Sequence, residues 1–241
     1  MPFQTINILG VPVASVTMTD AVEQVEKYID ERANVQIATA NAEMIMNAQR
    51  DERLMGILRK AALVTPDGAG TVWAAHHLGC EMPERVAGYD LVQELLKRAP
   101  KKNHRVYFFG SAPGVADKAK AEAERRYPGI NIVGTRNGFF TKVDEPAIIE
   151  DIRKSEPDIL LAALGVPKQE KWIDSHLPEL GVPVAIGVGG TLDVMAGVMK
   201  RAPLWMQRAK LEWLFRGMMQ PKRAGRLMAL PKFVIKVMHQ K

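Results

Sequence analysis

The stretch that decides the fold runs from Asp158 to Val188 and reads DILLAALGVPKQEKWIDSHLPELGVPVAIGV. It begins with an apolar run at 158–164, continues with a helical pattern at 168–177 and ends with a second apolar run at 182–188. A strand, a helix and a second strand in this order favour a mostly parallel sheet with helices packed on it.

The same alternation recurs through the first 195 residues. Further strands are predicted at 34–39, 62–65, 105–110 and 130–134, and further helices at 19–32, 42–60, 89–98, 114–127 and 145–154. After Arg201 the pattern predicts no strand, only helices broken near Pro221 and Pro231. We therefore predict an α/β fold, with a Rossmann-like core at 1–199 that carries helices on both faces, followed by a helical appendage at 200–241.

Basic residues are concentrated in the predicted appendage. The chain of 241 residues has 33 Lys and Arg against 27 Asp and Glu, a net charge of +6. Residues 200–241 hold 11 of the basic residues and a single acid, Glu212, so this segment carries +10 and the rest of the chain −4. Such asymmetry indicates a polyanionic partner, either a nucleic acid or an anionic membrane surface.

The appendage also has an amphipathic pattern. Its apolar residues can form one face with basic residues around it; the apolar set is Leu204, Leu211, Leu214, Phe215, Met218 and Met219, and the basic set is Arg208, Arg216, Lys222, Arg223 and Arg226. This suits a helix lying in a membrane interface. The alternative is that the apolar face packs on the body or on a second subunit. The charge asymmetry favours the membrane interface over packing on the body. Away from lipid, an exposed apolar face predicts self-association.

The protein is expected in the cytoplasm, on the inner face of the cell membrane. Its N-terminus lacks the pattern of a secretory signal, and its one cysteine, Cys80, cannot form an internal disulfide. No stretch approaches the 18 or so apolar residues that a membrane-spanning helix needs.

Two loops that follow predicted strands carry candidate site residues. In the first, 39–43, Thr39 ends a strand and Asn41 is placed to cap the next helix, where free N–H groups could bind an anion or a sugar hydroxyl. In the second, 65–70, Asp67 either shapes a Pro-Asp-Gly turn or accepts a proton from an attacking hydroxyl. The residues alone leave both alternatives open.

Three more loops have glycine or polar residues after a strand. Gly110 and Ser111 lie in one glycine-rich turn, and Gly189 and Gly190 lie in another, so that the backbone could approach a nucleotide closely. Neither turn has the GxGxxG fingerprint, and no Walker A motif is present. Gln169, in the third loop, could bind sugar or phosphate, or it could belong to an ordinary polar first turn of a helix.

The sequence lacks the residues that several classes of reaction need. The five histidines show no zinc spacing, and no Asp-x-Asp pair is present to hold a metal for a nucleotide-sugar substrate. We therefore expect no metal and no cofactor. If a nucleoside diphosphate leaves during the reaction, cations and backbone dipoles must stabilise it, and the basic appendage can supply the cations.

Seven motifs in order resemble the WecG/TagA/CpsF family of bacterial glycosyltransferases. They are TANAEMIMNAQRDERL, VTPDGAGTVWAAHHLG, ERVAGYDL, YFFGSAPGV, LGVPKQEKWI, GVGGTLDVMAG and RAPLWMQRAKLEWLFR, and the resemblance covers about residues 5 to 227. The resemblance implies an inverting, metal-independent transfer of N-acetylmannosamine, or its uronic acid, from the UDP-sugar. The acceptor would be the 4-hydroxyl of N-acetylglucosamine on undecaprenyl diphosphate, as in wall teichoic acid linkage-unit synthesis.

The resemblance also implies roles for matching residues. Asp67 matches a proposed catalytic base, and the sugar pocket is matched by Thr39, Asn41, Arg85 and Gln169. Three arginines of the appendage, Arg216, Arg223 and Arg226, match groups thought to close over the diphosphate. The donor stays open, because UDP-glucose and UDP-N-acetylglucosamine carry the same UDP group.

Two rival classes fit the sequence less well than a transferase. A nucleic-acid-binding protein would use the basic appendage on phosphates, but the large apolar face of the appendage argues against it. A dinucleotide-dependent oxidoreductase or epimerase is disfavoured by the lack of GxGxxG. We therefore expect a UDP-sugar donor, a lipid-linked acceptor and an anionic membrane as partners, and no nucleic acid.

Overall fold

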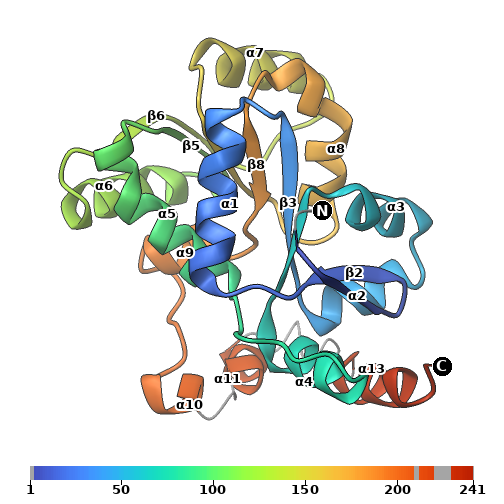
Figure 1. The fold of residues 1–241 in the computed structure, drawn as a ribbon. Coiled ribbons are helices and arrows are strands. Elements are labelled where there is room, and N and C mark those ends of the chain that lie inside the picture. The colour runs from blue at the N-terminus through green and yellow to red at the C-terminus, as the bar shows by residue number, and fades with distance from the viewer. Residues whose placement is uncertain (1–2, 209–211, 220–228, 241) are drawn as a thin grey trace.

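The computed structural model describes residues 3–208, 212–219 and 229–240, and it shows a sheet between two layers of helices (Figure 1). The strands are β1 (Thr5–Ile8), β2 (Val11–Ala14), β3 (Val35–Ala40), β4 (Leu63–Pro66), β5 (Arg105–Gly110), β6 (Asn131–Arg136), β7 (Ile159–Ala163) and β8 (Val184–Gly187). The helices are α1 (Met18–Asp30), α2 (Ala42–Ala48), α3 (Glu52–Lys60), α4 (Gly68–His77), α5 (Gly88–Lys102), α6 (Val115–Arg126), α7 (Glu145–Lys154), α8 (Lys168–Leu180), α9 (Thr191–Met195), α10 (Leu204–Arg208), α11 (Glu212–Met219) and α13 (Ala229–Met238).

The central sheet has six strands in the order β4-β3-β8-β7-β5-β6, and every neighbouring pair is parallel. Apolar residues of α1, α5, α6 and α9 pack on one face of it, and those of α2, α3, α7 and α8 pack on the other. The predicted α/β fold is confirmed, as are all six predicted strands, to within two residues at either end.

Side-chain alternation in β5 shows how the sequence builds the three layers. Successive side chains of a strand point to opposite faces of the sheet. Val106 and Phe108 therefore join the core under α1, α5 and α6, whereas Tyr107 and Phe109 join the core under α7 and α8. All four are fully buried, and burial of large apolar side chains is worth about 1.5 to 3 kcal/mol each.

The helix predicted at 42–60 is two helices. It is interrupted after α2, because the Asp51 carboxylate accepts a hydrogen bond of 3.1 Å from the backbone N–H of Leu54 and so begins α3. An aspartate at this position stabilises a helix start by satisfying an otherwise unpaired N–H group.

Besides the short helix α9, two features have no counterpart among the predictions: the hairpin of β1 and β2, and helix α4. The antiparallel hairpin of β1 and β2 turns at Leu9 and Gly10, which both have positive φ. Helix α4 begins GAG and shows no clear apolar stripe, so its sequence lacks the usual helical signal. Both elements pack into the core that lies against α2 and α3.

The last helix, α13, packs on the body against α2 and α4. Phe233 and Val237 are fully buried there. Just beyond the helix, the side chain of Gln240 accepts a hydrogen bond from the Leu9 N–H at 2.8 Å and donates one to the Asn7 carbonyl at 2.7 Å. For residues 229–240 the structure thus shows contact with the body.

Helix α13 begins at Ala229, two residues before Pro231, near which a break between helices was predicted. Pro231 lies in the first turn of α13, where a proline is tolerated because the N–H groups of the first turn have no partner within the helix. The break predicted near Pro221 falls outside the described residues.

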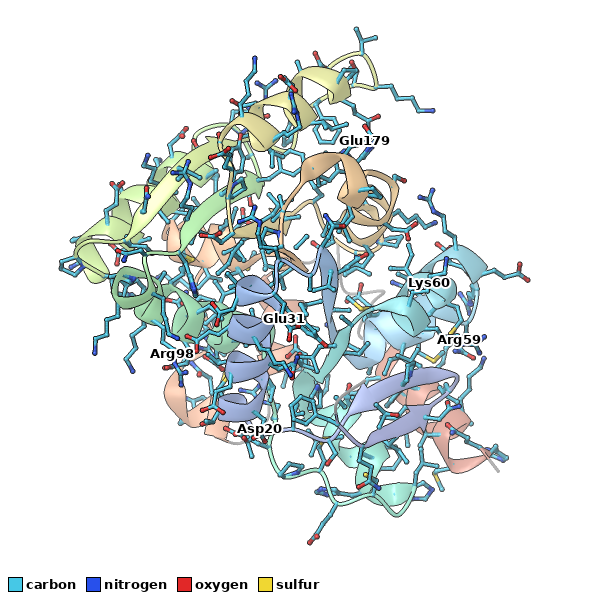
Figure 2. The ribbon with its side chains drawn as sticks, turned by 45° about the horizontal axis from the view of Figure 1, so that its top comes forward. Asp20, Glu31, Arg59, Lys60, Arg98 and Glu179 are labelled. Atoms are coloured by element: carbon cyan, nitrogen blue, oxygen red, sulfur yellow. The ribbon has the colours of Figure 1, made fainter. Side chains whose placement is uncertain are left out.

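Charged side chains lie on the outer surfaces of the helices. Figure 2 shows Lys60 on α3 and Glu179 on α8 pointing away from the sheet, and both residues are exposed. Within the described ranges, no helix is both long enough and apolar enough to span a bilayer.

Candidate active site

The loops that carry the candidate residues meet at one edge of the sheet. Four neighbouring parallel strands, β4, β3, β8 and β7, end side by side, and β5 follows next to β7. The chain leaves β3 toward α2 on one face and leaves β8 toward α9 on the other. Ligands of open α/β sheets bind at such a point, beyond the carboxyl ends of the strands.

Asp67 directly follows β4 and is the N-cap residue of α4. Its backbone N–H donates a 3.0 Å hydrogen bond to the carbonyl of Ala40, which ties the end of β4 to the end of β3. Its half-buried side chain makes no capping hydrogen bond to α4. The next residue, Gly68, has a φ of +83°, a conformation that glycine adopts without strain. The backbone therefore fixes Asp67 at the strand end.

Asn41 caps α2, as predicted. Its Oδ1 accepts a 2.9 Å hydrogen bond from the Met44 N–H, and its Cβ lies 3.8 Å from the place a Cβ on Gly68 would take. The Asn41 and Asp67 loops are thus in contact. Thr39, two residues earlier on β3, is buried against the start of α5, where a Cβ on Gly88 would come within 2.9 Å of its Oγ1.

The segment that carries Arg85 lies over the ends of β3 and β4. The Val86 N–H donates a 3.0 Å hydrogen bond to the carbonyl of Pro66, the residue before Asp67. The residue after Arg85 is therefore bonded to the residue before the candidate base, Asp67. Its guanidinium contacts the appendage, because Nη1 donates to the carboxylate of Glu212 on α11.

Arg201, where the appendage begins, joins this cluster. Its guanidinium donates two parallel hydrogen bonds to Asp90 of α5, at 2.7 and 2.8 Å, and a third of 3.2 Å to Glu212. The centre of the Tyr89 ring lies 4.5 Å from it. A second, longer contact of 3.7 Å joins Arg85 to Asp90. Two cations and two carboxylates thus connect the body to α11.

The side chain of Gln169 connects two loops. Its Oε1 accepts hydrogen bonds from the N–H groups of Gly165 and Gly189, at 3.1 and 3.0 Å, so one amide holds the loops after β7 and β8 together. Its Nε2 donates to Glu170 Oε1 at 2.7 Å. Gly187 must lack a side chain here, because a Cβ would come within 2.7 Å of that Nε2.

The two glycine-rich turns are linked through Ser111. Its hydroxyl donates a 3.1 Å hydrogen bond to Asp193 of α9, while a Cβ on Gly110 would come within 2.4 Å of the Ala163 carbonyl oxygen. Gly189 has a positive φ of 54°, and Gly190 leads into α9. The close approach at Gly110 and the positive φ at Gly189 both favour glycine at the strand ends.

The structure describes little of the three predicted diphosphate-binding arginines. Arg216 lies on α11, but its side chain falls outside the described part of the chain, as do Arg223 and Arg226 entirely. Among the described residues, no three His, Cys, Asp or Glu side chains gather in a way that could hold a metal ion.

Comparison with known proteins bears on the chemistry of this edge. Residues 6–241 match the model of the glycosyl transferase WecG/TagA/CpsF family. The chain belongs to this family. It is 33% identical over 238 residues to the N-acetylglucosaminyldiphosphoundecaprenol N-acetyl-beta-D-mannosaminyltransferase of Bacillus subtilis strain 168, covering 98% of this chain and 92% of that protein.

Two further relatives of this glycosyl transferase carry the same name. The protein of Staphylococcus aureus strain MW2 is 33% identical over 96% of this chain and 91% of its own. That of Bacillus spizizenii strain W23 is 36% identical over 88% of this chain and 81% of its own. The resemblance stated from the motifs is confirmed at the level of the family.

Sequence reasoning missed four residues that contact the candidate site residues or their partners: Asp90, Arg201, Glu212 and Glu170. The first three come together across more than a hundred residues of chain, which no local pattern reveals. One signal was available, because Glu212 is the single acid in a strongly basic segment. Glu170 has the sequence setting of an ordinary polar helix start, yet it is buried.

Proposed function

We propose that this chain transfers N-acetylmannosamine from UDP-N-acetylmannosamine to N-acetylglucosamine on undecaprenyl diphosphate. The observation that carries the proposal is the identity of 33% over nearly the full length of both chains with a relative named for this transfer. The structure supports it by bringing the candidate residues from separate loops to one edge of the sheet.

The proposed reaction is a single inverting displacement. The 4-hydroxyl oxygen of the acceptor forms a bond to C1 of the donor sugar, and the bond from C1 to the UDP oxygen breaks, leaving its electron pair on UDP. Asp67 takes the proton of the attacking hydroxyl. General-base assistance of this kind is typically worth about 10²- to 10⁴-fold in rate.

The proposed sugar pocket lies around the ends of β3 and β4. Thr39, Asn41 and Arg85 come from the two segments in contact with the Asp67 loop. The loops after β5 and β8, with Gly110, Ser111, Gly189 and Gly190, would contact the nucleotide. Gln169 serves the same pocket through its hydrogen bonds to Gly165 and Gly189, because these fix the shape of the backbone.

Charge that develops on UDP would be stabilised by arginines in place of a metal ion. Arg216, Arg223 and Arg226 are the proposed groups, since guanidinium groups are permanently charged and can pair with phosphate through two hydrogen bonds. In this proposal the appendage at 200–241 takes part in catalysis as well as in attachment.

An anionic membrane surface is the proposed site of action. Trp73, Trp205 and Trp213 are 37%, 65% and 41% exposed, although tryptophans are usually well covered. They lie on α4, α10 and α11, at the lower end of Figure 1, where α13 with the exposed Ile235 and Met238 also lies. Tryptophan is favoured at membrane interfaces, and basic residues are attracted to anionic lipid.

The test is an assay with a water-soluble prenyl-diphosphate-linked N-acetylglucosamine and each candidate donor in turn. Turnover is expected with UDP-N-acetylmannosamine, and it should survive excess EDTA. Transfer from the uronic acid, glucose or N-acetylglucosamine donor instead would replace the proposed donor while keeping the chemistry. Loss of turnover in EDTA, with recovery on adding Mg²⁺ or Mn²⁺, would contradict the arginine-based account of the leaving group.

A further inference from the structure

Two ion pairs of different kinds make up the cluster of Arg85, Asp90, Arg201 and Glu212. Asp90 and Arg201 form a complete pair, because both carboxylate oxygens accept from both ends of one guanidinium. Arg85 has no such partner within the described part of the body, since its contact with Asp90 is 3.7 Å long. Its close partner is Glu212, which belongs to α11.

Glu212 occupies the position of an anion. Its two carboxylate oxygens contact two different arginines, Arg85 through Oε2 and Arg201 through Oε1. Without this carboxylate, the three remaining charged groups, Arg85, Arg201 and Asp90, would carry a net charge of +1. The body and the start of the appendage thus form a cationic site, and α11 fills it with a carboxylate.

The site is next to the proposed chemistry. Arg85 precedes Val86, whose N–H bonds to the residue before Asp67. The Glu212 side chain is only 13% exposed, and the two arginines lower its pKa against the opposing effect of burial. The Glu212 carboxyl is therefore ionised at neutral pH, where a diphosphate is also anionic.

The sequence supports a special role for this carboxylate. Residues 200–241 contain eleven basic residues and no acid other than Glu212. A segment selected only to attract anions would gain from a neutral residue at this place. The lone acid instead lies against Arg85, which the proposed function assigns to the sugar pocket.

We propose that Glu212 is a placeholder for a diphosphate: its carboxylate lies between Arg85 and Arg201, and a substrate diphosphate displaces it on binding. The inference rests on the proposed function, since it names where one of its diphosphates binds. Two sources offer this group, the UDP of the donor and the prenyl diphosphate of the acceptor. Displacement would release α11 from Arg85, so binding and movement of the appendage are coupled.

The test is titration calorimetry of the full chain with UDP and, separately, with farnesyl diphosphate. Glu212→Gln keeps the size of the side chain and removes its charge. We expect the variant to bind the diphosphate that uses this site roughly 3- to 10-fold more tightly, since a partly exposed ion pair need no longer be broken. The probe that gains affinity identifies the source.

Two further variants control the measurement. Glu150→Gln changes the net charge equally but acts on α7, where Glu150 pairs with Arg153, and it should leave both dissociation constants unchanged. Arg201→Gln removes one of the two cations, so it should weaken the same probe by about 3- to 10-fold, provided its thermal midpoint shows a folded protein.

The outcomes separate the two proposals. Equal or weaker binding of both probes by Glu212→Gln, with clear binding by the wild type, would overturn the placeholder and leave the transferase in place. Binding of neither probe by the wild type would overturn the transferase and the placeholder together.

Discussion

Glu170 Oε1 accepts a 2.7 Å hydrogen bond from Nε2 of Gln169, and this bond fixes which way the Gln169 amide faces. Because Nε2 is turned toward Glu170, Oε1 faces the N–H groups of Gly165 and Gly189. The other oxygen of Glu170 is buried without a hydrogen-bond partner among the described residues. Burial of the carboxyl raises the pKa of Glu170 to about 7, against the lowering effect of the Gln169 bond.

This pKa predicts a loss of stability as the pH rises. The folded protein holds the Glu170 proton up to about pH 7, whereas the unfolded chain releases it near 4.5. Stability linked to this proton is therefore complete below pH 4.5 and falls until the pH exceeds 7, by about 3 kcal/mol in all. Glu170→Gln cannot lose a proton, so its free energy of unfolding should fall less between about pH 5 and 8.

Urea denaturation at about pH 5, 6, 7 and 8 measures this difference in slope. Glu179→Gln is the matched control, because Glu179 lies on the same helix, α8, and is exposed (Figure 2). The control should follow the wild type. Parallel curves for wild type and Glu170→Gln would show that Glu170 is ionised in the fold over this whole range.

Asp67→Asn should lower turnover by about 10²- to 10⁴-fold while UDP binding and the thermal midpoint stay near the wild-type values. The amide keeps the shape of the side chain but cannot accept the hydroxyl proton. Asp174→Asn serves as the control, since it removes a carboxylate from α8 that pairs with Arg53 at 3.4 Å. Near-normal turnover by Asp67→Asn would remove Asp67 from the base role.

Phe233→Ala should lower the free energy of unfolding by about 3 to 5 kcal/mol. Phe233 is fully buried where α13 packs on α2 and α4. Ile235→Ala, two residues away on the same helix and 58% exposed, should change it by less than about 0.5 kcal/mol. Equal effects in chemical denaturation would mean that α13 does not stay on the body in solution.

The position of α13 also bears on deletion of the appendage. Truncation near Arg201 would uncover the core that Phe233 and Val237 complete, so loss of activity would have two explanations. Point substitutions in the full chain avoid this problem.

Replacing Arg216, Arg223 and Arg226 together with Gln should slow turnover strongly and leave sedimentation with anionic vesicles largely intact. The apolar face is unchanged, and most of the basic residues remain. A variant with Lys222, Lys232 and Lys236 replaced by Gln carries the same charge change and should retain activity. If the arginine variant keeps full activity, the appendage is only an anchor and the diphosphate is held by groups in the body. If both triple variants are equally slow, the positive charge of the appendage matters and the three arginines have no special role.

The central sheet could be predicted because its strands are short apolar runs followed by polar or glycine loops. The same reasoning failed for α4, whose glycine-rich start hides the helix. It also failed for the hairpin, because its turn residues, Leu9 and Gly10, are not one of the Asn-Gly or Asp-Gly pairs that mark a tight turn in a sequence. Positions of site loops follow from strand ends, so the sequence alone was enough to predict that Asn41 and Asp67 lie at the same edge of the sheet.

What the sequence could not supply were contacts made by tertiary packing. Gln169 and Glu170 look like the polar first turn of a helix, and they are buried only because Gly187 on the neighbouring strand leaves room for them. The pairing of Arg85 with Glu212 depends on where α11 lies on the body, and the sequence pattern of α11 does not encode that.

The hydrogen bonds of Gln240 to Asn7 and Leu9 tie the residue that follows α13 to the hairpin of β1 and β2. This has a consequence for biosynthesis. The core that holds Ile8 and Val11 also needs Phe233 and Val237, so it stays incomplete until α13 has been synthesised and has left the ribosome. Apolar surface of α2 and α4 is exposed until then, which makes the nascent protein a natural client for chaperones that bind such surface.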